Sequence, residues 1–484
     1  MVFSSHLFLF YFLPLTLLLY YAVGKRGRHL VLTLLSYAFY GWANPWFVLL
    51  MLASTFIDYW CGIAIMRGGP ESNPNLEILP KEQERTRHQR IALTVSIVAN
   101  LSLLGFFKYF NFGVENYNGM MASLGLDSAI WDTTLRVTLP LGISFYTFQS
   151  MSYSIDVFRG DARGMKNPVD FACYVSMFPQ LVAGPIIRFA DVADQLRERS
   201  HTMTKFARGT AMFALGMCKK IMLANPCGKV ADTVFDAGSA GVMESWHGVV
   251  AYAMQIYFDF SAYSDMAIGL GLMIGFVFPK NFDSPYKSQS ITEFWRRWHI
   301  SLSSWLRDYL YVPLGGNRKG EARTYVHLAT VMLFGGLWHG SSWNFVIWGA
   351  IHGGWLAAER AMGKDSFYAK MPRVMRVLIT FVIVLFAWVF FRSPDLSSSM
   401  TYIASMFGLA DVQAGAPLLD LVIWQPYYIV SFLAALSVAF FAPQSWDWTR
   451  TLTPCKAVLV ALGLWVSITF LFTQSYNPFI YFLF

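Results

Sequence analysis

The sequence predicts an all-helical integral membrane protein that crosses the bilayer many times. Apolar residues make up 55% of the 484-residue chain and charged residues only 14%, whereas a soluble globular chain carries roughly 25% charged residues. Apolar runs near the ~20 residues that span a hydrocarbon core recur along the chain. They include "HLFLFYFLPLTLLLYYAV", "IALTVSIVANLSLLGFF", "VLITFVIVLFAWVFF" and "AVLVALGLWVSITFLF". We therefore expect one membrane domain over residues 1–484, with about ten to twelve helices, some of them re-entrant.

The first apolar run, near residues 6–23, lacks the basic region and the small-residue cleavage site of a signal peptide. It should therefore remain in the protein as a helix. Residues 30–66 are long enough for two further spans, and the sequence "WANPW" between them predicts the turn.

Lysine and arginine gather in short loops between the apolar runs, whereas residues 114–134 contain neither. The basic loops are residues 24–29, 80–90, 158–166 and 188–208. Cytoplasmic loops of membrane proteins carry such an excess of positive charge. We therefore predict a cytoplasmic loop over residues 67–90 and an N-terminus outside the cytoplasm, and we attribute the net charge of +8 to topology rather than to nucleic-acid binding.

Two segments are atypical for membrane spans. Residues 169–187 have basic flanks at both ends, so this segment need not cross and should be re-entrant or interfacial. Residues 284–320 mix aromatic and charged side chains and are too polar for a simple span. We expect the second segment to lie along the cytoplasmic boundary or to dip into the protein.

Two histidines stand in the stretch "GGLWHGSSWNFVIWGAIHGG" (335–354), which contains no acid, lysine or arginine. Ionisable groups inside a membrane are functional candidates by default, and burial favours the neutral imidazole that a general base needs. His339 is therefore a candidate base. The alternative, a hydrogen-bonded packing residue, stays open for His339 and is favoured for His352.

A second group lies in "FWRRWHISLSSWLRDYLYVPLGGNR", where arginines and a histidine stand among tryptophans. An interfacial amphipathic helix would place the aromatic rings at headgroup depth and the arginines near lipid phosphates. An anion-binding mouth for a phosphorylated cofactor would use the same guanidinium groups. Both interpretations apply to Arg296, Arg297 and Arg307.

Acids and a broken helix complete the candidates. Asp259 and Asp265 interrupt "QIYFDFSAYSDMAIGLGLMIGF", so both should point inward, either paired with an arginine or acting directly. In "LVAGPIIRF" a Gly-Pro pair breaks a helix before Arg188, and a broken helix can line a cavity. Five scattered cysteines form no CxxC pair and no metal-like spacing with histidine, so we expect small core residues and no metal.

Together these segments resemble the membrane-bound O-acyltransferase family, and most closely its bacterial branch that acetylates alginate and similar exopolysaccharides. The matching stretches are "MVFSSHLFLFYFLPL", "FPQLVAGPIIRFADVADQL", "IYFDFSAYSDMAIGLGLMIGFVFPKNFDSPYKSQSITEFWRRWHISLSSWLRDYLYVPLGGNR" and "GLWHGSSWNFVIWGAIHG". They lie within residues 1–360, whereas the helices of 373–484 match only in hydropathy. The resemblance implies a ring of helices around a tunnel across the membrane.

The resemblance also implies roles for single residues. The family's catalytic histidine corresponds to His339, and its assisting polar position in the membrane core corresponds to His299. Arg296, Arg297 and Arg307 are candidates for holding the phosphates of the acyl donor. The remaining candidates for lining or supporting the tunnel are Asp265, Trp338, His352 and Arg188.

The implied activity is that of an O-acetyltransferase in the bacterial cytoplasmic (inner) membrane. It would move acetyl groups from cytoplasmic acetyl-CoA toward an exported polysaccharide, with membrane lipids around it and without nucleic acid. The chain contains no soluble transferase domain, so the resemblance implies an extracytoplasmic partner protein. Cellulose, a teichoic-acid component, a lipid or a protein remain alternative acceptors. A transporter is the alternative from another class, but related halves with matching broken helices are not found.

Overall fold

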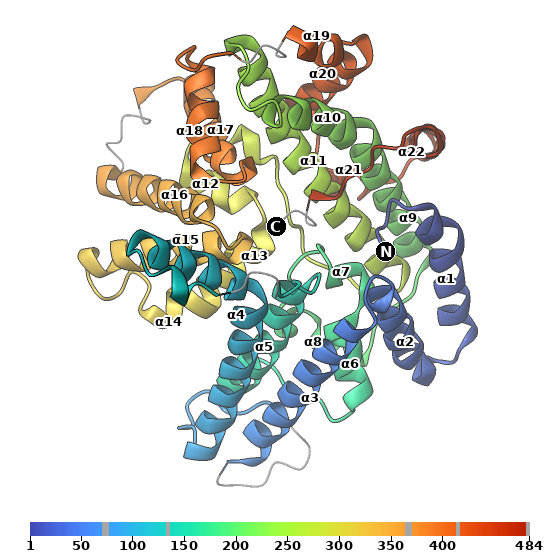
Figure 1. Ribbon diagram of the computed structural model, residues 1–484. Coiled ribbons are helices and arrows are strands. Elements are labelled where there is room, and N and C mark those ends of the chain that lie inside the picture. The colour runs from blue at the N-terminus through green and yellow to red at the C-terminus, as the bar shows by residue number, and fades with distance from the viewer. Residues whose placement is uncertain (70–76, 132–135, 364–369, 413–416, 481–484) are drawn as a thin grey trace. The chain divides into compact units, whose positions relative to one another are not determined.

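The computed structural model describes residues 1–69, 77–131, 136–363, 370–412 and 417–480, and every regular element in these ranges is a helix (Figure 1). The chain forms two compact units. The first unit comprises residues 1–203 and 271–278, and the second comprises residues 204–270 and 279–484. The predicted all-helical class is confirmed, while the single membrane domain remains a prediction.

The first unit contains eight of the labelled α-helices and a π-helical entry to the first of them. After the π-helix η1 (Phe8–Phe12) they are α1 (Leu13–Ala22), α2 (Arg28–Gly41), α3 (Trp46–Arg67), α4 (Arg87–Ser123), α5 (Ile143–Arg159), α6 (Pro168–Ser176), α7 (Phe178–Leu181) and α8 (Phe189–Arg197), with short 3-10 turns η2 (Lys25–Gly27) and η3 (Asp127–Ala129). The predicted first span is thus an apolar helix over Phe8–Ala22. Pro14 has no N–H to donate, which explains why the turn before it is widened.

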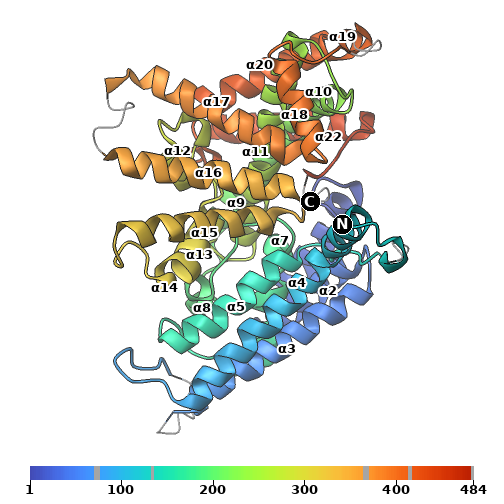
Figure 2. The same cartoon turned by 60° about the vertical axis from the view of Figure 1, so that its left-hand side comes forward.

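Helices α3, α4 and α5 lie side by side in both views (Figures 1 and 2). The predicted turn at "WANPW" is confirmed, because α2 ends at Gly41 and Pro45 caps the start of α3. Between α3 and α4, the fully buried carboxylate of Asp58 accepts hydrogen bonds from Ser96 and Asn100. An acid inside an apolar helix pair is stable only with such partners.

The second unit begins with α9 (Met203–Cys218), which continues through the π-helix η4 (Lys219–Ala224) into α10 (Asn225–Phe235). Its long helices are α11 (Val242–Met273), whose last three residues belong to the first unit, α15 (Glu321–His339), α16 (Trp343–Met362), α17 (Arg373–Arg392), α20 (Pro426–Phe441) and α22 (Pro454–Thr473). Shorter helices are α18 (Leu396–Met406), α19 (Pro417–Ile423) and α21 (Ser445–Trp448).

Among the residues that the structure describes, four helices are long and apolar enough to cross a membrane, namely α3, α4, α17 and α22. Three of these helices, α4, α17 and α22, contain apolar runs from which membrane spans are predicted in the sequence analysis. The two atypical segments contain only short helices. Residues 169–187 form most of α6 and all of α7, and residues 284–320 form η5 (Pro285–Lys287), α12 (Ile291–Arg297), α13 (Ile300–Leu306), η6 (Arg307–Tyr311) and α14 (Val312–Leu314). Neither segment makes a single long helix, and the predicted placement of each segment relative to the membrane stays a prediction.

Helices α15 and α16 form a tight hairpin, and they lie side by side in both views (Figures 1 and 2). Glycines make this approach possible. A Cβ on Gly336 would overlap the carbonyl oxygen of Phe345, and a Cβ on Gly349 would lie 2.5 Å from the carbonyl oxygen of Met332. Gly336 in "GGLWHG" and Gly349 in "WGAIHGG" therefore allow the close backbone packing of α15 and α16, which fixes where the nearby histidines lie.

Candidate functional site

His339 is the last residue of α15 and is buried, with 8% of its surface exposed. The chain leaves the helix at once, because Gly340 is extended. Three aromatic rings meet the imidazole edge to face: Trp338 at 4.9 Å, Trp348 at 5.2 Å and Phe391 at 5.1 Å between ring centroids. This aromatic enclosure restricts the rotation of the ring and keeps bulk water away from it.

A small cavity adjoins His339 within the second unit. Its free volume is about 10 Å³, which is close to the room that one water molecule needs. It is lined by Ile256, Phe260, Trp298, His339, Trp388, Phe391 and Ile480. Because His339 is the ionisable member of this lining, a reacting group that enters here meets one imidazole among apolar walls.

His299 lies at the start of α13 and is fully buried. Its backbone is in the left-handed region, with φ 44°, which is uncommon for a residue other than glycine. Such backbone strain persists only where the surroundings hold it, and it is frequent at functional sites. The strained turn aims the imidazole at Asn281, whose Oδ1 lies 3.2 Å from Nδ1 of His299.

The partners of Asn281 determine the tautomer of His299. The backbone N–H and the hydroxyl of Ser301 both donate to Oδ1 of Asn281, so this atom is the amide oxygen. The amide nitrogen of Asn281 donates to the hydroxyl of Ser264. Nδ1 of His299 therefore carries the proton and donates it to Asn281. Nε2 is left with a lone pair, and this buried atom has no hydrogen-bond partner in the part of the chain that the structure describes.

Trp338 lies between the two candidate histidines. Its ring centroid is 6.0 Å from that of His299 and 4.9 Å from that of His339. Phe260 also connects the two histidines, because it lines the cavity beside His339 and its ring centroid lies 4.6 Å from that of His299. The structure thus brings together two stretches that the sequence separates by about forty residues, as the family resemblance implies.

His352 contacts Trp348, as His339 does. Its ring is 4.8 Å from that of Trp348, and its Nδ1 accepts a hydrogen bond of 3.3 Å from Nε1 of Trp295. It is fully buried and stacks against Phe294. These contacts agree with the packing role that the sequence favours, and His352 does not line the cavity beside His339.

The three candidate arginines differ in their surroundings. Arg296 is exposed and makes no ion pair with any residue that the structure describes. Arg297 pairs with Glu293 at 2.7 Å and donates to the carbonyl oxygen of Asp283. Arg307 is exposed and pairs with Asp308 at 2.7 Å. Among these three arginines, Arg296 can therefore bind a phosphate without first breaking an ion pair with a carboxylate.

The acids of α11 have lysine partners, not the arginines considered from sequence. Lys219 lies 2.6 Å from Asp265, and Lys220 lies 2.7 Å from Asp259. Both lysines lie in the π-helix η4. They were not recognised as partners of these acids, because the rest of η4 is apolar. The sequence gives one signal for them, since "CKKIM" places two adjacent cations inside an otherwise apolar run.

The segment after α22 reaches the same region. The N–H of Ile480 donates to Asp259, and the carbonyl oxygen of Pro478 accepts from Lys220. Ile480 also lines the cavity beside His339. Sequence analysis assigned no role to this segment, because its resemblance to the family was limited to hydropathy.

Arg188 belongs to the first unit, where it caps the start of α8. Its guanidinium pairs with Asp191 across 3.0 Å, one helical turn further on. This contact orders the chain after the Gly-Pro break and gives Arg188 a local structural partner. A role beside a tunnel stays a prediction for this residue.

Comparisons with known proteins agree with the resemblance. Residues 5–394 match the sequence profile of MBOAT, the membrane-bound O-acyltransferase family. The probable alginate O-acetylase AlgI of Pseudomonas putida is 43% identical over all of both chains. That of Pseudomonas aeruginosa is 47% identical over 85% of this chain and 76% of its own length. A peptidoglycan O-acetyltransferase of Helicobacter pylori is 33% identical over 100% of this chain and 97% of its own.

Proposed function

The chain belongs to the membrane-bound O-acyltransferase family and is an O-acyltransferase, and on that premise we propose that it moves acetyl groups from cytoplasmic acetyl-CoA across the bacterial inner membrane for the O-acetylation of an exported polysaccharide. Alginate or a similar exopolysaccharide is the proposed acceptor. The observation that carries the proposal is the enclosure of His339 beside a cavity, with Trp338 linking it to His299.

His339 is the proposed general base. As the acceptor hydroxyl attacks the acetyl thioester, its oxygen forms a bond to the acetyl carbon and the carbon–sulfur bond breaks. His339 takes the hydroxyl proton, which then passes to the departing thiolate. A positioned base typically speeds such a step by ~10²–10⁴-fold, and holding donor and acceptor in line adds the advantage of proximity.

His299 is the proposed assisting residue. With Nδ1 donating to Asn281, its Nε2 offers a lone pair toward the interior, where it can accept a hydrogen bond from a reacting group. A fixed tautomer costs no reorganisation at the moment of reaction, which is how preorganised polar groups assist catalysis.

Donor binding is assigned to the arginines of residues 296–307. Guanidinium forks recognise phosphates in two-point contacts, and the phosphates of acetyl-CoA supply such groups. Arg296 is available for this contact as it stands, whereas Arg297 and Arg307 would exchange a carboxylate for the phosphate.

An extracytoplasmic transferase partner is proposed to receive the acetyl group or to present the polysaccharide. A second acceptor, peptidoglycan, is favoured by the relative from Helicobacter pylori, which aligns along nearly all of both chains. The two acceptors share the hydroxyl chemistry at His339 and differ only in what reaches it from outside the cytoplasm.

The test is His339→Ala in cells that produce the polymer. We expect the variant to insert normally, because it removes a polar group from an apolar enclosure. Acetyl transfer should fall by at least the ~10²-fold expected of a general base. His352→Ala is the matched control, since it removes a second buried imidazole in contact with Trp348 but away from the cavity.

The measurement is the acetyl content of the exported polysaccharide, together with the amount of each variant in the membrane. Near-normal acetylation in well-inserted His339→Ala protein would defeat the mechanism. Loss of acetylation in both variants at equal levels would assign His339 a packing role instead. Analysis of purified peptidoglycan from the same cells distinguishes the two acceptors.

A further inference from the structure

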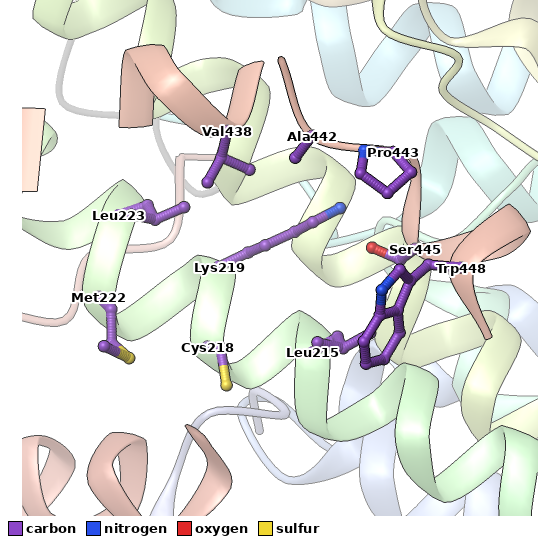
Figure 3. Close-up of a pocket in the computed structure, with 10 residues that line it drawn as sticks. All are labelled: Leu215, Cys218, Lys219, Met222, Leu223, Val438, Ala442, Pro443, Ser445 and Trp448. Carbon is purple, nitrogen blue, oxygen red and sulfur yellow. The ribbon is translucent and has the colours of Figure 1, made fainter. Parts of the chain in front are cut away.

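A second cavity lies in the second unit, between the α9–η4 helix and the end of α20 (Figure 3). Its free volume is about 310 Å³, within the size range of ligand pockets. Its walls are mainly apolar and include Leu215, Met222, Leu223, Val438 and Trp448. We call this cavity the apolar slot. In size and chemistry it suits a hydrocarbon chain.

One cation crosses the apolar slot, but its charge is already satisfied. The side chain of Lys219 runs across the slot (Figure 3), and its ammonium pairs with Asp265 at 2.6 Å. The methylene stem therefore adds to the apolar lining, as long basic side chains commonly do. The charge needed to select a ligand must come from the rim.

The rim of the slot is basic. Lys456 donates to the carbonyl oxygen of Trp448 at 2.8 Å and lies over its ring at 4.8 Å. Lys287 lies 3.4 Å from the carbonyl oxygen of Ala442, another lining residue. Arg208 lies over the ring of Trp446 at 4.8 Å. Lys456 and Lys287 thus contact residues that line the slot, whereas Arg208 contacts Trp446, a neighbour of the lining residues Ser445 and Trp448 in the short helix α21.

Arg450 adds a further guanidinium group, whose carboxylate partner is shared with a second cation. It is 63% exposed and lies 3.4 Å from Asp447, which is held more closely by Lys280 at 2.7 Å. Burial lowers the pKa of Arg208, the charge of Arg450 lowers it further, and the carboxylate of Asp447 raises it. Two guanidinium groups therefore lie near one carboxylate that Lys280 also binds, and this excess of positive charge would attract a further anion.

We propose that the apolar slot and its basic rim form a binding site for an anionic phospholipid. One acyl chain fills the slot, and the phosphodiester headgroup lies against Arg208 and Arg450. Basic pockets between membrane helices on the cytoplasmic side bind such headgroups. Arg208 ends the basic stretch 188–208, which is predicted to face the cytoplasm.

A soluble phosphate compound would meet the same arginines but would leave the slot empty. The helices next to the slot face lipid, because α20 exposes Val430 and Leu433 and α22 exposes Leu462. A hydrocarbon chain can enter the slot from such surroundings. The combination of slot and rim therefore favours a lipid over free phosphate.

The experiment uses the purified full-length protein in neutral detergent, with lipid binding measured by native mass spectrometry. Phosphatidylglycerol is compared with phosphatidylcholine of the same chains, and inorganic phosphate serves as the competitor without chains. We expect phosphatidylglycerol to bind at least fivefold more tightly. Arg208→Gln and Arg450→Gln should each weaken its binding about fivefold, the effect of one basic residue near the headgroup.

Val438→Phe tests the slot, because the larger ring fills part of it and should weaken phosphatidylglycerol binding at least fivefold. Val430→Phe is its control on the same helix, 66% exposed, and should bind as the wild type does. Arg323→Gln, which removes an exposed charge elsewhere in the unit, controls for net charge. Arg450→Gln should fold normally, because the exposed Arg450 side chain contributes little to stability. A loss of lipid binding in this variant therefore cannot be attributed to misfolding.

Equal affinity for the two lipids would overturn the proposed headgroup contact. Wild-type affinity in Val438→Phe would overturn the proposed chain position. Displacement of phosphatidylglycerol by inorganic phosphate alone at comparable concentration would reassign the rim to a soluble anion. The site lies apart from the cavity beside His339, so each outcome leaves the proposed acetyl transfer to be judged separately.

Discussion

Asn281 fixes the tautomer of His299. Its Oδ1 accepts hydrogen bonds from Ser301 and from Nδ1 of His299, and its amide nitrogen donates to Ser264. Rotating the amide to present a donor to His299 would break these contacts. The proton is thereby kept on Nδ1, and Nε2 remains the basic atom. An assisting role for His299 thus depends on a residue from another part of the chain.

Asn281→Leu should therefore reduce acetyl transfer about tenfold, because one oriented hydrogen bond contributes 0.5–1.5 kcal/mol. Asn281→Asp keeps the acceptor and should restore much of the rate. Its carboxylate favours the imidazolium, so the acid limb of the pH–rate profile should move to higher pH. The measurement is acetyl transfer in membrane vesicles across pH, with Ser264→Ala as the control for disturbed packing. Equal rates and an unshifted profile in both Asn281 variants would leave Asn281 a purely structural residue.

Arg296→Glu should raise the concentration of acetyl-CoA needed for half-maximal transfer about tenfold, because a charged hydrogen bond to phosphate is worth roughly 1.5–3 kcal/mol. Arg307→Glu should have a smaller effect, since its guanidinium already pairs with Asp308. The requirement for the acceptor should not change. Donor and acceptor titrations check this, and an unchanged donor requirement in these variants and in Arg297→Glu would return the arginines to the role of interfacial anchors.

Lys220→Met should destabilise the protein by about 3–5 kcal/mol, the usual effect of leaving one charge of a buried pair without its partner. Lys220 and Asp259 are 4% and 1% exposed, so water cannot compensate. Lys81→Met breaks a pair that is 65% and 38% exposed and should have a much smaller effect on stability, because water screens the two charges. Thermal unfolding of the purified variants checks the contrast. Similar midpoints for the two would show that the buried pair contributes no more than the surface one.

Single cysteines should report the predicted topology. In a Cys455→Ser background, which removes the exposed native thiol, Glu82→Cys should react with a membrane-impermeant maleimide only after the cytoplasmic side is opened. Asp127→Cys should react in intact cells, because it lies in the stretch without lysine or arginine. Both positions are exposed. Labelling of Glu82→Cys in intact cells would invert the proposed orientation.

Much of the fold could be predicted because hydropathy depends on single residues and their neighbours. The apolar runs in α4, α17 and α22 correspond to helices that can cross a membrane. Charge likewise marked residues 169–187 and 284–320 as atypical for membrane spans, and both contain only short helices. In each case the information is local, so no knowledge of tertiary contacts was needed.

The site was only partly predictable, because its partners are distant in sequence. His339 and His299 were identified, and both were found near Trp338. Asn281 was missed because "PKNFDSPYK" contains nothing that marks an asparagine as the partner of a histidine eighteen residues away. Lys220 was missed because its role depends on Asp259, which lies two helices further on.

The room beside His339 bears on which nucleophile the enzyme accepts. An acetyl thioester held in an open, wet site would be lost to hydrolysis, since water outnumbers any polysaccharide hydroxyl. A cavity of about 10 Å³ admits about one water molecule, so larger groups enter only by pushing aromatic side chains apart. A base enclosed in this way remains idle until substrates of the right size open its surroundings. Under the proposed function, this closure would conserve acetyl donor in cells that have no polymer to modify.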